Sequence, residues 1–332
     1  AIEVCDWSSD VCSSDLTLYG MADLFIIGQF EDISSITAVS IGSQVMHMIT
    51  VMIVGLAMGA TVNIGQAIGA GNKKKAAKDI GNTVTLFMML AIAGAAGLLF
   101  FIKPIVGMMS TPQEAVHETV IYLTICFLGI PFITAYNIIS SIFRGIGDSK
   151  SPMYFIAAAC AINIILDYLF IGGLHMGAAG AALGTTCSQT ISVLIALVVI
   201  MKKKTGISLS KNDFKIDRKT IKRLLKIGIP VALQDGFIQI AFIIITIIAN
   251  RRGLDTAAAV GIVEKIISFL FLVPSSMLST VSALGAQNIG AGKRERAQRI
   301  LYYAVIITVG FGVMISIRSE EHTSELQSHT SI

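Results

Sequence analysis

Long apolar stretches, separated by short polar segments, run along most of the chain. Residues 83–101, 156–172, 178–201 and 237–248 hold almost no charge. About 20 apolar residues cross the hydrocarbon core of a bilayer as a helix, whereas a surface helix of a soluble domain keeps a polar face. The pattern predicts nine helices, near 17–30, 36–65, 81–108, 119–143, 153–172, 178–201, 221–249, 257–283 and 300–317. We therefore predict an all-α, polytopic transmembrane helix bundle.

Composition agrees with this prediction. Of the 332 residues, 54% are hydrophobic and 14% are charged, and the mean hydropathy is +0.76. Soluble domains have about 45–50% apolar and about 25% charged residues. The cysteines within the predicted spans, Cys126, Cys160 and Cys187, have no CxxC spacing. They indicate free cysteines in helices and neither a disulfide nor a metal site.

The two ends of the chain differ from its middle. The segments CDWSSDVCSSDL at 5–16 and RSEEHTSELQS at 318–328 are polar. They resemble translations of the two strands of a common sequencing-library adapter. We therefore expect residues 1–16 and 318–332 to be foreign sequence and exclude them from the interpretation of the fold. The remainder carries 24 Lys and Arg against 14 Asp and Glu, a net charge of +10 instead of +4.

The basic residues predict the orientation in the membrane. Segments 71–80, 144–151, 202–226 and 290–299 alternate with less basic loops and hold 20 of the 24 Lys and Arg. Short loops rich in Lys and Arg stay on the cytoplasmic side. We expect a multi-pass protein of the cytoplasmic (inner) membrane, surrounded by the lipid bilayer. The cytoplasmic position accounts for the runs of lysine, so we expect no nucleic-acid partner.

An internal repeat divides the chain. Residues 66–76 (QAIGAGNKKKA) match residues 287–297 (QNIGAGKRERA) at an offset of 221 positions. Both copies end a span and begin a basic segment, so six helices separate them and the orientation is preserved. Parallel repeats of this kind are typical of transporters built from two similar bundles. We predict an N-lobe at 17–201, a cytoplasmic linker at 202–220 and an incomplete C-lobe at 221–317, with twelve helices in the intact protein.

Few ionisable residues lie well inside the predicted spans. They are Asp23, Asp167, Asp235, Glu264 and Lys265. A charge at the bilayer centre costs about 2.5–3.5 kcal/mol on insertion scales, so each is a functional candidate. Asp235 lies near a basic stretch and Pro230, which favours a role at the start of its helix.

Asp23 and Asp167 each follow a polar residue by four positions, Tyr19 and Asn163 respectively. This spacing places each pair on one helix face. Two carboxyl groups facing one cavity favour a shared proton, as proton-coupled exchange requires. The alternative is a pair of hydrogen-bonded aspartates near helix ends, because both lie in the extracellular half of their spans.

The sequence lacks the common nucleotide-binding and hydrolase motifs. The segment RGIGDSKSP at 144–152 lacks the spacing of a phosphate-binding loop, so ATP binding is not supported. HExxH and GxSxG do not occur, and His47, His117 and His175 are scattered. We expect no cofactor and no enzymatic activity.

Four segments together resemble the multidrug and toxic compound extrusion (MATE) family, in particular its prokaryotic DinF-like and MepA-like branches. They are QxIGAG in both halves, FRGIGDSKSPM at 143–153, NIILDYLFIGG at 163–173 and GAAGAALGTT at 177–186. The resemblance covers residues 17–317. It implies a V-shaped pair of six-helix lobes that exports cationic or amphipathic compounds in exchange for H⁺ or Na⁺.

The resemblance also implies site residues. It implies that the coupling cation is bound by Asp23, Asp167, Asn163 and Thr185. If this cation is Na⁺, Asp23 and Asp167 are its ligands, and we expect no other metal site. Tyr19, Tyr122, Ser140 and Asn163 correspond to the residues that line the substrate cavity. Some members carry a C-lobe glutamate eight residues after a proline, where this chain has Ile238, so we expect no C-lobe Na⁺ site.

The favoured hypothesis is a monomeric, secondary active multidrug efflux antiporter. The alternative is a flippase for a lipid-linked oligosaccharide, a related architecture whose cavity is usually richer in basic residues. The N-lobe spans offer carboxyl groups instead, which favours the antiporter.

Overall fold

The computed structural model describes residues 22–109, 111–202, 207, 209–251, 260, 263, 267 and 270–330, without side chains at 250, 251, 272 and 316–330. After helical residues 22–30, the helices are α2 (Ile33–Gly69), α3 (Lys73–Phe100), α4 (Ile102–Met108), α5 (Gln113–Ile146), α6 (Lys150–Asp167), α7 (Gly177–Lys202), α8 (Arg218–Arg251), α10 (Leu272–Gly290) and α11 (Arg294–Thr330). Seven helices of the described chain are long and apolar enough to cross a membrane, and none of the described residues forms a strand. The predicted all-α membrane bundle is confirmed.

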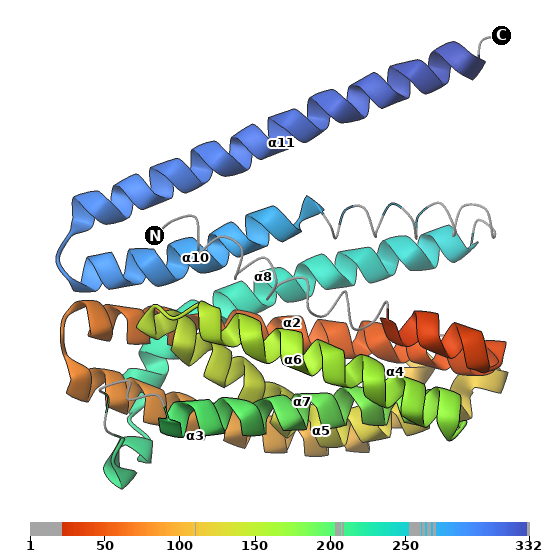
Figure 1. Cartoon of the computed structure of the whole chain (residues 1–332), viewed down its shortest axis with the longest axis horizontal. Helices are drawn as coiled ribbons and strands as arrows, with labels where there is room; N and C mark the ends of the chain where they lie inside the picture. Colours follow the sequence, from red (N-terminus) through yellow and green to blue (C-terminus); the bar gives the residue numbers. More distant parts are fainter. Residues whose placement is uncertain are drawn as a thin grey trace.

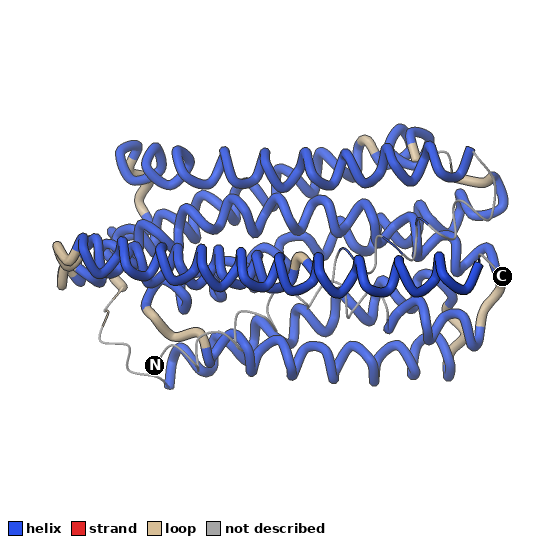
Figure 2. The backbone as a smooth tube through the Cα atoms, turned by 90° about the horizontal axis from the view of Figure 1, so that it is seen from above, coloured by secondary structure: helices blue, strands red, loops and turns tan. Residues whose placement is uncertain are grey.

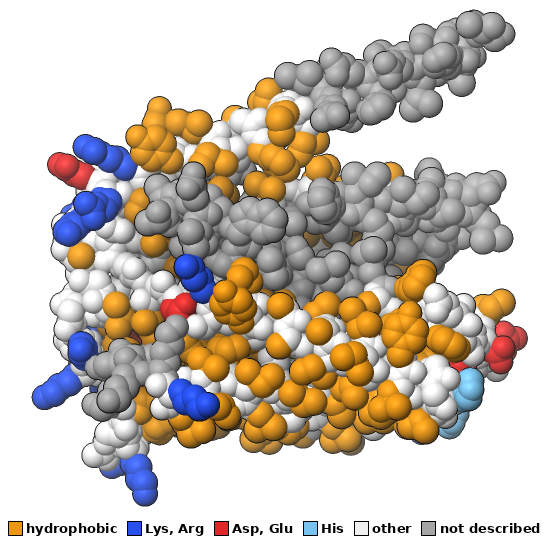
Figure 3. Space-filling model, in the orientation of Figure 1, with side chains coloured by type: hydrophobic (Ala, Val, Ile, Leu, Met, Phe, Trp, Pro, Cys, Tyr) orange, Lys and Arg blue, Asp and Glu red, His pale blue; other side chains and the backbone are white. Residues whose placement is uncertain are grey.

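The long helices lie side by side, with their connections gathered at two ends (Figures 1 and 2). Helix α11 diverges from the others toward the C-terminus (Figure 1). On the face shown in Figure 3, hydrophobic side chains cover the flanks, Lys and Arg gather at one end, and acidic residues and a histidine lie at the other. The four basic segments thus share one end of the bundle, as the predicted orientation requires.

Helix ends extend beyond the predicted limits because hydropathy detects only the part within the hydrocarbon core. Helix α3 starts at Lys73, within a segment predicted to be a loop, where the Asn72 side chain accepts a hydrogen bond from Lys75 N at 2.9 Å. The predicted helix at 81–108 is divided, since α3 ends at Phe100 and α4 starts at Ile102. Pro104 explains the break, because its ring would clash with the carbonyl group four residues earlier. The predicted helix at 257–283 lies partly outside the described residues.

The sequence repeat extends to the backbone hydrogen bonds. At the end of α2, Ala70 N, Gly71 N and Asn72 N donate to the carbonyls of Gln66, Ile68 and Ala67. At the end of α10, the residues 221 positions later make the same three bonds, with lengths of 2.9–3.0 Å. Gly71 and Gly292 both have positive φ, at 70° and 74°. The two copies therefore form the same helix-ending turn, which requires glycine at this position.

The two copies of the repeat also contact each other. A methyl group added at Gly69 would overlap the backbone oxygen of Gln287, and one added at Gly290 would overlap that of Gln66. The 221-residue offset relates Gly69 to Gly290 and Gln66 to Gln287, so each contact is the symmetry equivalent of the other. Helices α2 and α10 therefore cross about a local two-fold axis. The Gln287 side chain also donates to the Gly145 carbonyl at 3.0 Å, which ties α10 to the end of α5.

Small residues bring α8 equally close to α2. Methyl groups at Gly59 and Gly228 would overlap the carbonyl oxygens of Leu224 and Leu56, and one at Gly55 would lie 2.8 Å from the Cα of Ala232. Gly55 and Gly59 have the small-xxx-small spacing that permits close helix packing in membranes. These contacts between α2 and α8 lie in the half of α2 that is nearer the basic end of the bundle.

Candidate functional site

Asp23 and Thr185 join the first helical segment to α7. Thr185 Oγ1 donates a hydrogen bond to Asp23 Oδ2 at 3.2 Å. Asp23 is 2% exposed, and Thr185 lies two turns inside the outer end of α7. Two residues 162 positions apart in the chain thus meet in the outer half of the bundle.

Asp167 lies at the end of α6 and points toward α7. Its residue is fully buried, and a methyl group at Gly184 would overlap Asp167 Oδ1. Gly184 therefore leaves the space that the carboxylate occupies. A π-helix, Tyr168–Gly173, follows Asp167 directly. Such wider turns recur at functional sites because they redirect neighbouring side chains.

Asn163 completes the cluster one turn before Asp167. Asn163 and Asp167 of α6 both interact with the Asp23 carboxyl group, so α6 joins the first helical segment and α7 at this point. Asn163 is fully buried, and its amide atoms and both oxygens of Asp167 have no hydrogen bond of good geometry within the described chain. We call Asp23, Asn163, Asp167 and Thr185 the carboxyl cluster.

Tyr122 of α5 lies beside this cluster. Its hydroxyl is 3.2 Å from Ser43 Oγ, and its ring fills the space above Gly42, where a methyl group would overlap it. Tyr122 interacts electrostatically with Asp23 and is 2% exposed. Ser140 lies elsewhere: it is 18 residues further along α5, about 27 Å along the helix axis. The structure therefore does not bring Ser140 to the carboxyl cluster.

The remaining candidates are Tyr19, Asp235, Glu264 and Lys265. Tyr19, Glu264 and Lys265 lie outside the described residues. Asp235 is on α8 and faces α2, with its Oδ2 3.0 Å from a methyl group placed at Gly55. It thus belongs to the contact between α2 and α8 and not to the helix start, because α8 begins at Arg218.

Two polar contacts, which no sequence pattern indicates, connect the helices at the outer end of the site; we call them the polar brace. The Gly177 N–H at the start of α7 donates to Glu31 Oε1 at 3.3 Å. Ser35 of α2 donates a hydrogen bond to Glu118 of α5. Gly177 has φ of 56°, which favours glycine. The brace fixes the outer ends of the helices that carry Asp23, Tyr122 and Thr185.

The two carboxyl groups of this cluster, those of Asp23 and Asp167, have no positively charged side chain of the described chain beside them. No Lys or Arg of the described chain acts on Asp23 or Asp167. An isolated buried carboxylate is very costly, so such groups take up a proton or bind a cation. The cluster offers carboxyl, hydroxyl and amide oxygens, the ligand types that hard cations prefer.

Comparisons with known proteins identify relatives. The family model described as MatE matches residues 15–169 and 230–319. The chain is 31% identical over 278 residues to the probable multidrug resistance protein YpnP of Bacillus subtilis (strain 168), covering 82% of this chain and 61% of that protein. It is 27% identical over 316 residues to the probable multidrug resistance protein YoeA of the same strain, covering 93% of this chain and 68% of that protein.

A solved structure described as MATE in the bent conformation superposes with a TM-score of 0.85 at 25% identity. The match covers 93% of this chain and 69% of that chain. The chain therefore spans 61–69% of the length of these three proteins.

Proposed function

This chain belongs to the MatE family, and on that premise we propose that it exports small cationic or amphipathic molecules in exchange for H⁺ or Na⁺. The fold and the relatives place it in the cytoplasmic membrane, as the sequence predicted. Two of the relatives described above are named as probable multidrug resistance proteins. The proposal extends that activity to this chain, as a monomer without a cofactor.

The contact between Asp23 and Asp167 carries this proposal. Within the described chain the two buried carboxyl groups have no basic partner, which suits them to bind a positive charge that enters from solution. A proton or Na⁺ can supply it, and so can a cationic substrate. Ligands that need the same carboxyl groups oppose each other's binding, so entry of the coupling ion favours release of the substrate.

The residues around the cluster argue against the alternatives. A flippase for a lipid-linked oligosaccharide must neutralise phosphate, and the carboxyl cluster has the wrong charge for that task. An intramembrane enzyme has no support, because members of this family are transporters.

We further propose that segments 1–16 and 318–332 are foreign and that the intact protein has twelve helices. The family match runs from residue 15 to residue 319, which nearly coincides with the stretch that remains without them. Transport experiments therefore use the uninterrupted gene, without these two segments.

The test compares Asp167→Asn and Asp23→Asn with Asp32→Asn, an exposed aspartate at the outer end of the bundle. Ethidium export is measured in bacteria that lack their own efflux pumps, and membrane insertion is checked by immunoblot. We expect both cluster variants to lose export and Asp32→Asn to retain it. Normal export by Asp167→Asn would overturn the coupling role, and no export by the unmodified protein would overturn the transport proposal.

Everted vesicles identify the ion. Ethidium should release H⁺ from acid-loaded vesicles if protons couple transport. A strict requirement for added Na⁺ in the same vesicles would assign Na⁺ instead.

A further inference from the structure

A basic cavity lies at the cytoplasmic end of the bundle, far from the carboxyl cluster. It has a volume of about 810 Å³ and is lined by seven Lys or Arg side chains and two Asp side chains. The lining comes from the first turns of α3 in the N-lobe, the end of the linker and the first turns of α8 in the C-lobe. The cavity thus spans the boundary between the two lobes.

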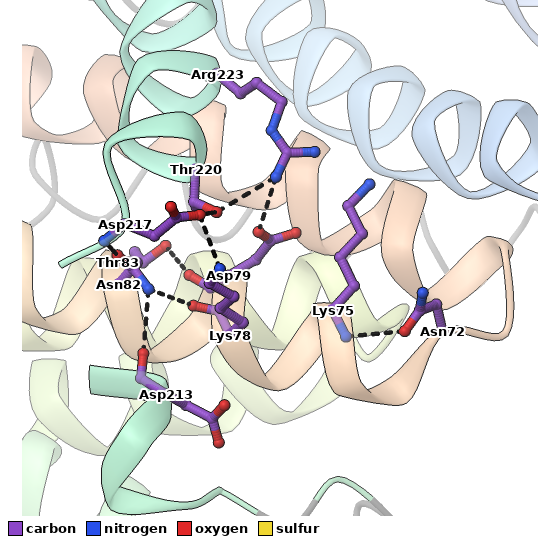
Figure 4. Close-up of polar contacts among 10 residues, drawn as sticks. All are labelled: Asn72, Lys75, Lys78, Asp79, Asn82, Thr83, Asp213, Asp217, Thr220 and Arg223. Carbon is purple, nitrogen blue, oxygen red and sulfur yellow. Dashed lines mark hydrogen bonds and ion pairs between the residues drawn. The ribbon is translucent and has the colours of Figure 1, made fainter. Parts of the chain in front are cut away.

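Two ion pairs organise its wall. Lys78 Nζ lies 3.0 Å from Asp217 Oδ2, and Arg223 Nη2 lies 3.6 Å from Asp79 Oδ1. Figure 4 shows Arg223 of α8 pointing toward Asp79 of α3, with Lys78 and Asp217 meeting beside them. Asp79 is 1% exposed, so this pair anchors the guanidinium group at the wall.

Both carboxylates of the lining are engaged by these pairs, which leaves an excess of five positive charges. The five further basic residues of the lining are Lys74, Lys75, Lys219, Lys222 and Lys226. Orientation in the membrane depends on how many Lys and Arg flank the spans, not on their convergence around one cavity. Like charges that converge repel each other, so the arrangement fits a bound anion.

Arg223 can supply part of that binding. Its Nη2 contacts Asp79 and donates to Thr220 Oγ1 at 3.3 Å, while a guanidinium carries five N–H donors. Its remaining donors suit two oxygens of one phosphate group. The positive ends of the α3 and α8 dipoles also lie at this cavity. A phosphate group matches this chemistry.

A shallow, open apolar groove on the surface of α8 continues from the basic cavity. It has a volume of about 560 Å³, and it shares Lys222 and Lys226 with the basic cavity. Its apolar wall includes Ile221, Leu225 and Ile229, which recur every four residues and therefore lie on one helix face. The strip runs from the start of α8 into its membrane-spanning part. A free phosphate ion makes no apolar contacts with such a strip, whereas the acyl chain of a lipid can pack along it.

We propose that the basic cavity and this groove together bind one anionic phospholipid of the cytoplasmic leaflet. Its phosphate lies among Lys222, Lys226 and Arg223, and one acyl chain lies along the apolar face of α8. Basic pockets between membrane helices on the cytoplasmic side recognise lipid headgroups in this way. Because α3 and α8 belong to different lobes, the lipid stabilises the state in which their cytoplasmic ends are together.

The first experiment measures lipid binding by native mass spectrometry of the purified protein in a neutral detergent. Phosphatidylglycerol is titrated against phosphatidylcholine with the same acyl chains. We expect one tightly bound phosphatidylglycerol and at least tenfold weaker binding of phosphatidylcholine. Equal binding of the two lipids would overturn the proposal.

The variant Lys222→Gln/Lys226→Gln tests the cavity itself. Each basic residue at the membrane surface contributes about fivefold to the binding of an anionic lipid, so we expect roughly 30-fold weaker binding. The matched control is Lys150→Gln/Lys293→Gln, which removes the same charge from exposed residues on the same side but outside the cavity. An equal loss in both variants would show general surface attraction and overturn the site.

Two further measurements remove the remaining ambiguities. Inorganic phosphate should not displace phosphatidylglycerol at equal concentration, and displacement would assign the cavity to a soluble phosphate instead. In the unmodified protein, Lys222 and Lys226 should be acetylated more slowly in phosphatidylglycerol vesicles than in phosphatidylcholine vesicles, relative to Lys150. Equal labelling ratios would contradict the site without relying on any variant.

Discussion

The crossing of α2 and α10 predicts that two alanine substitutions are strongly non-additive. At Gly69 and at Gly290, an added methyl group would overlap a backbone carbonyl oxygen of the facing helix. A backbone atom cannot rotate aside, so the two helices must move apart. We expect each single alanine to lower the free energy of unfolding by about 1–3 kcal/mol, the usual cost of overpacking.

The expected value for the double variant follows from the local two-fold symmetry. One separation of α2 from α10 relieves both overlaps, because the two contacts exchange under the repeat. The second alanine should therefore cost far less than the first. We expect Gly69→Ala/Gly290→Ala to be about as unstable as the worse single variant, with an interaction energy of about 1 kcal/mol or more.

The assay is thermal unfolding in detergent, followed with a thiol-reactive dye that reports exposure of the buried Cys126. All variants are heated at one rate, because unfolding of such proteins is commonly irreversible. Gly285→Ala is the matched control: it lies on α10 with no neighbouring atom within 4 Å of the added methyl group. Alanine is favoured over glycine in helices by about 1 kcal/mol, so this control should not lower the Tm. Additive losses at Gly69 and Gly290 would refute the shared-separation argument.

Three further predictions concern the carboxyl cluster and the linker. Gly184→Ala pushes a methyl group onto Asp167 Oδ1 and should cut ethidium export at least tenfold; unchanged export in an inserted protein would contradict this. Asn82→Ala removes a buried side chain that bonds the linker backbone twice and should cost about 1–3 kcal/mol and speed tryptic cleavage of the linker; unchanged cleavage would contradict this. The hydrogen bond from Lys78 lowers the pKa of Asp217 to about 2, below its ordinary 3.8, so this pairing stabilises the protein above pH 4 and is lost as the pH falls toward 2. Asp217→Asn should flatten the Tm decline over that range, and identical profiles would contradict it.

The spans and the repeat could be predicted from the sequence because each has a strict physical requirement. A bilayer demands about 20 apolar residues per helix, and this length is visible in a single sequence. The helix-ending turn demands a positive φ, so Gly71 and Gly292 stand at equivalent places in both copies. The helix ends were missed because α3 continues from the bilayer into its basic segment, where Asn72 caps it and hydropathy carries no signal.

The candidate site could be predicted only in part, for a reason that lies in its energetics. Asp23 and Asp167 stand out in the sequence because a buried charge costs free energy on its own. Gly184 costs little, so nothing in the sequence distinguishes it from other glycines, although it leaves the space for the Asp167 carboxylate. The partner Thr185 is 162 positions from Asp23, so no local spacing reveals this contact, and only the family resemblance named the two residues together. A buried charged residue can be recognised in the sequence because its burial costs free energy, whereas the small residues that leave space for it can be recognised only from the contacts in the folded bundle.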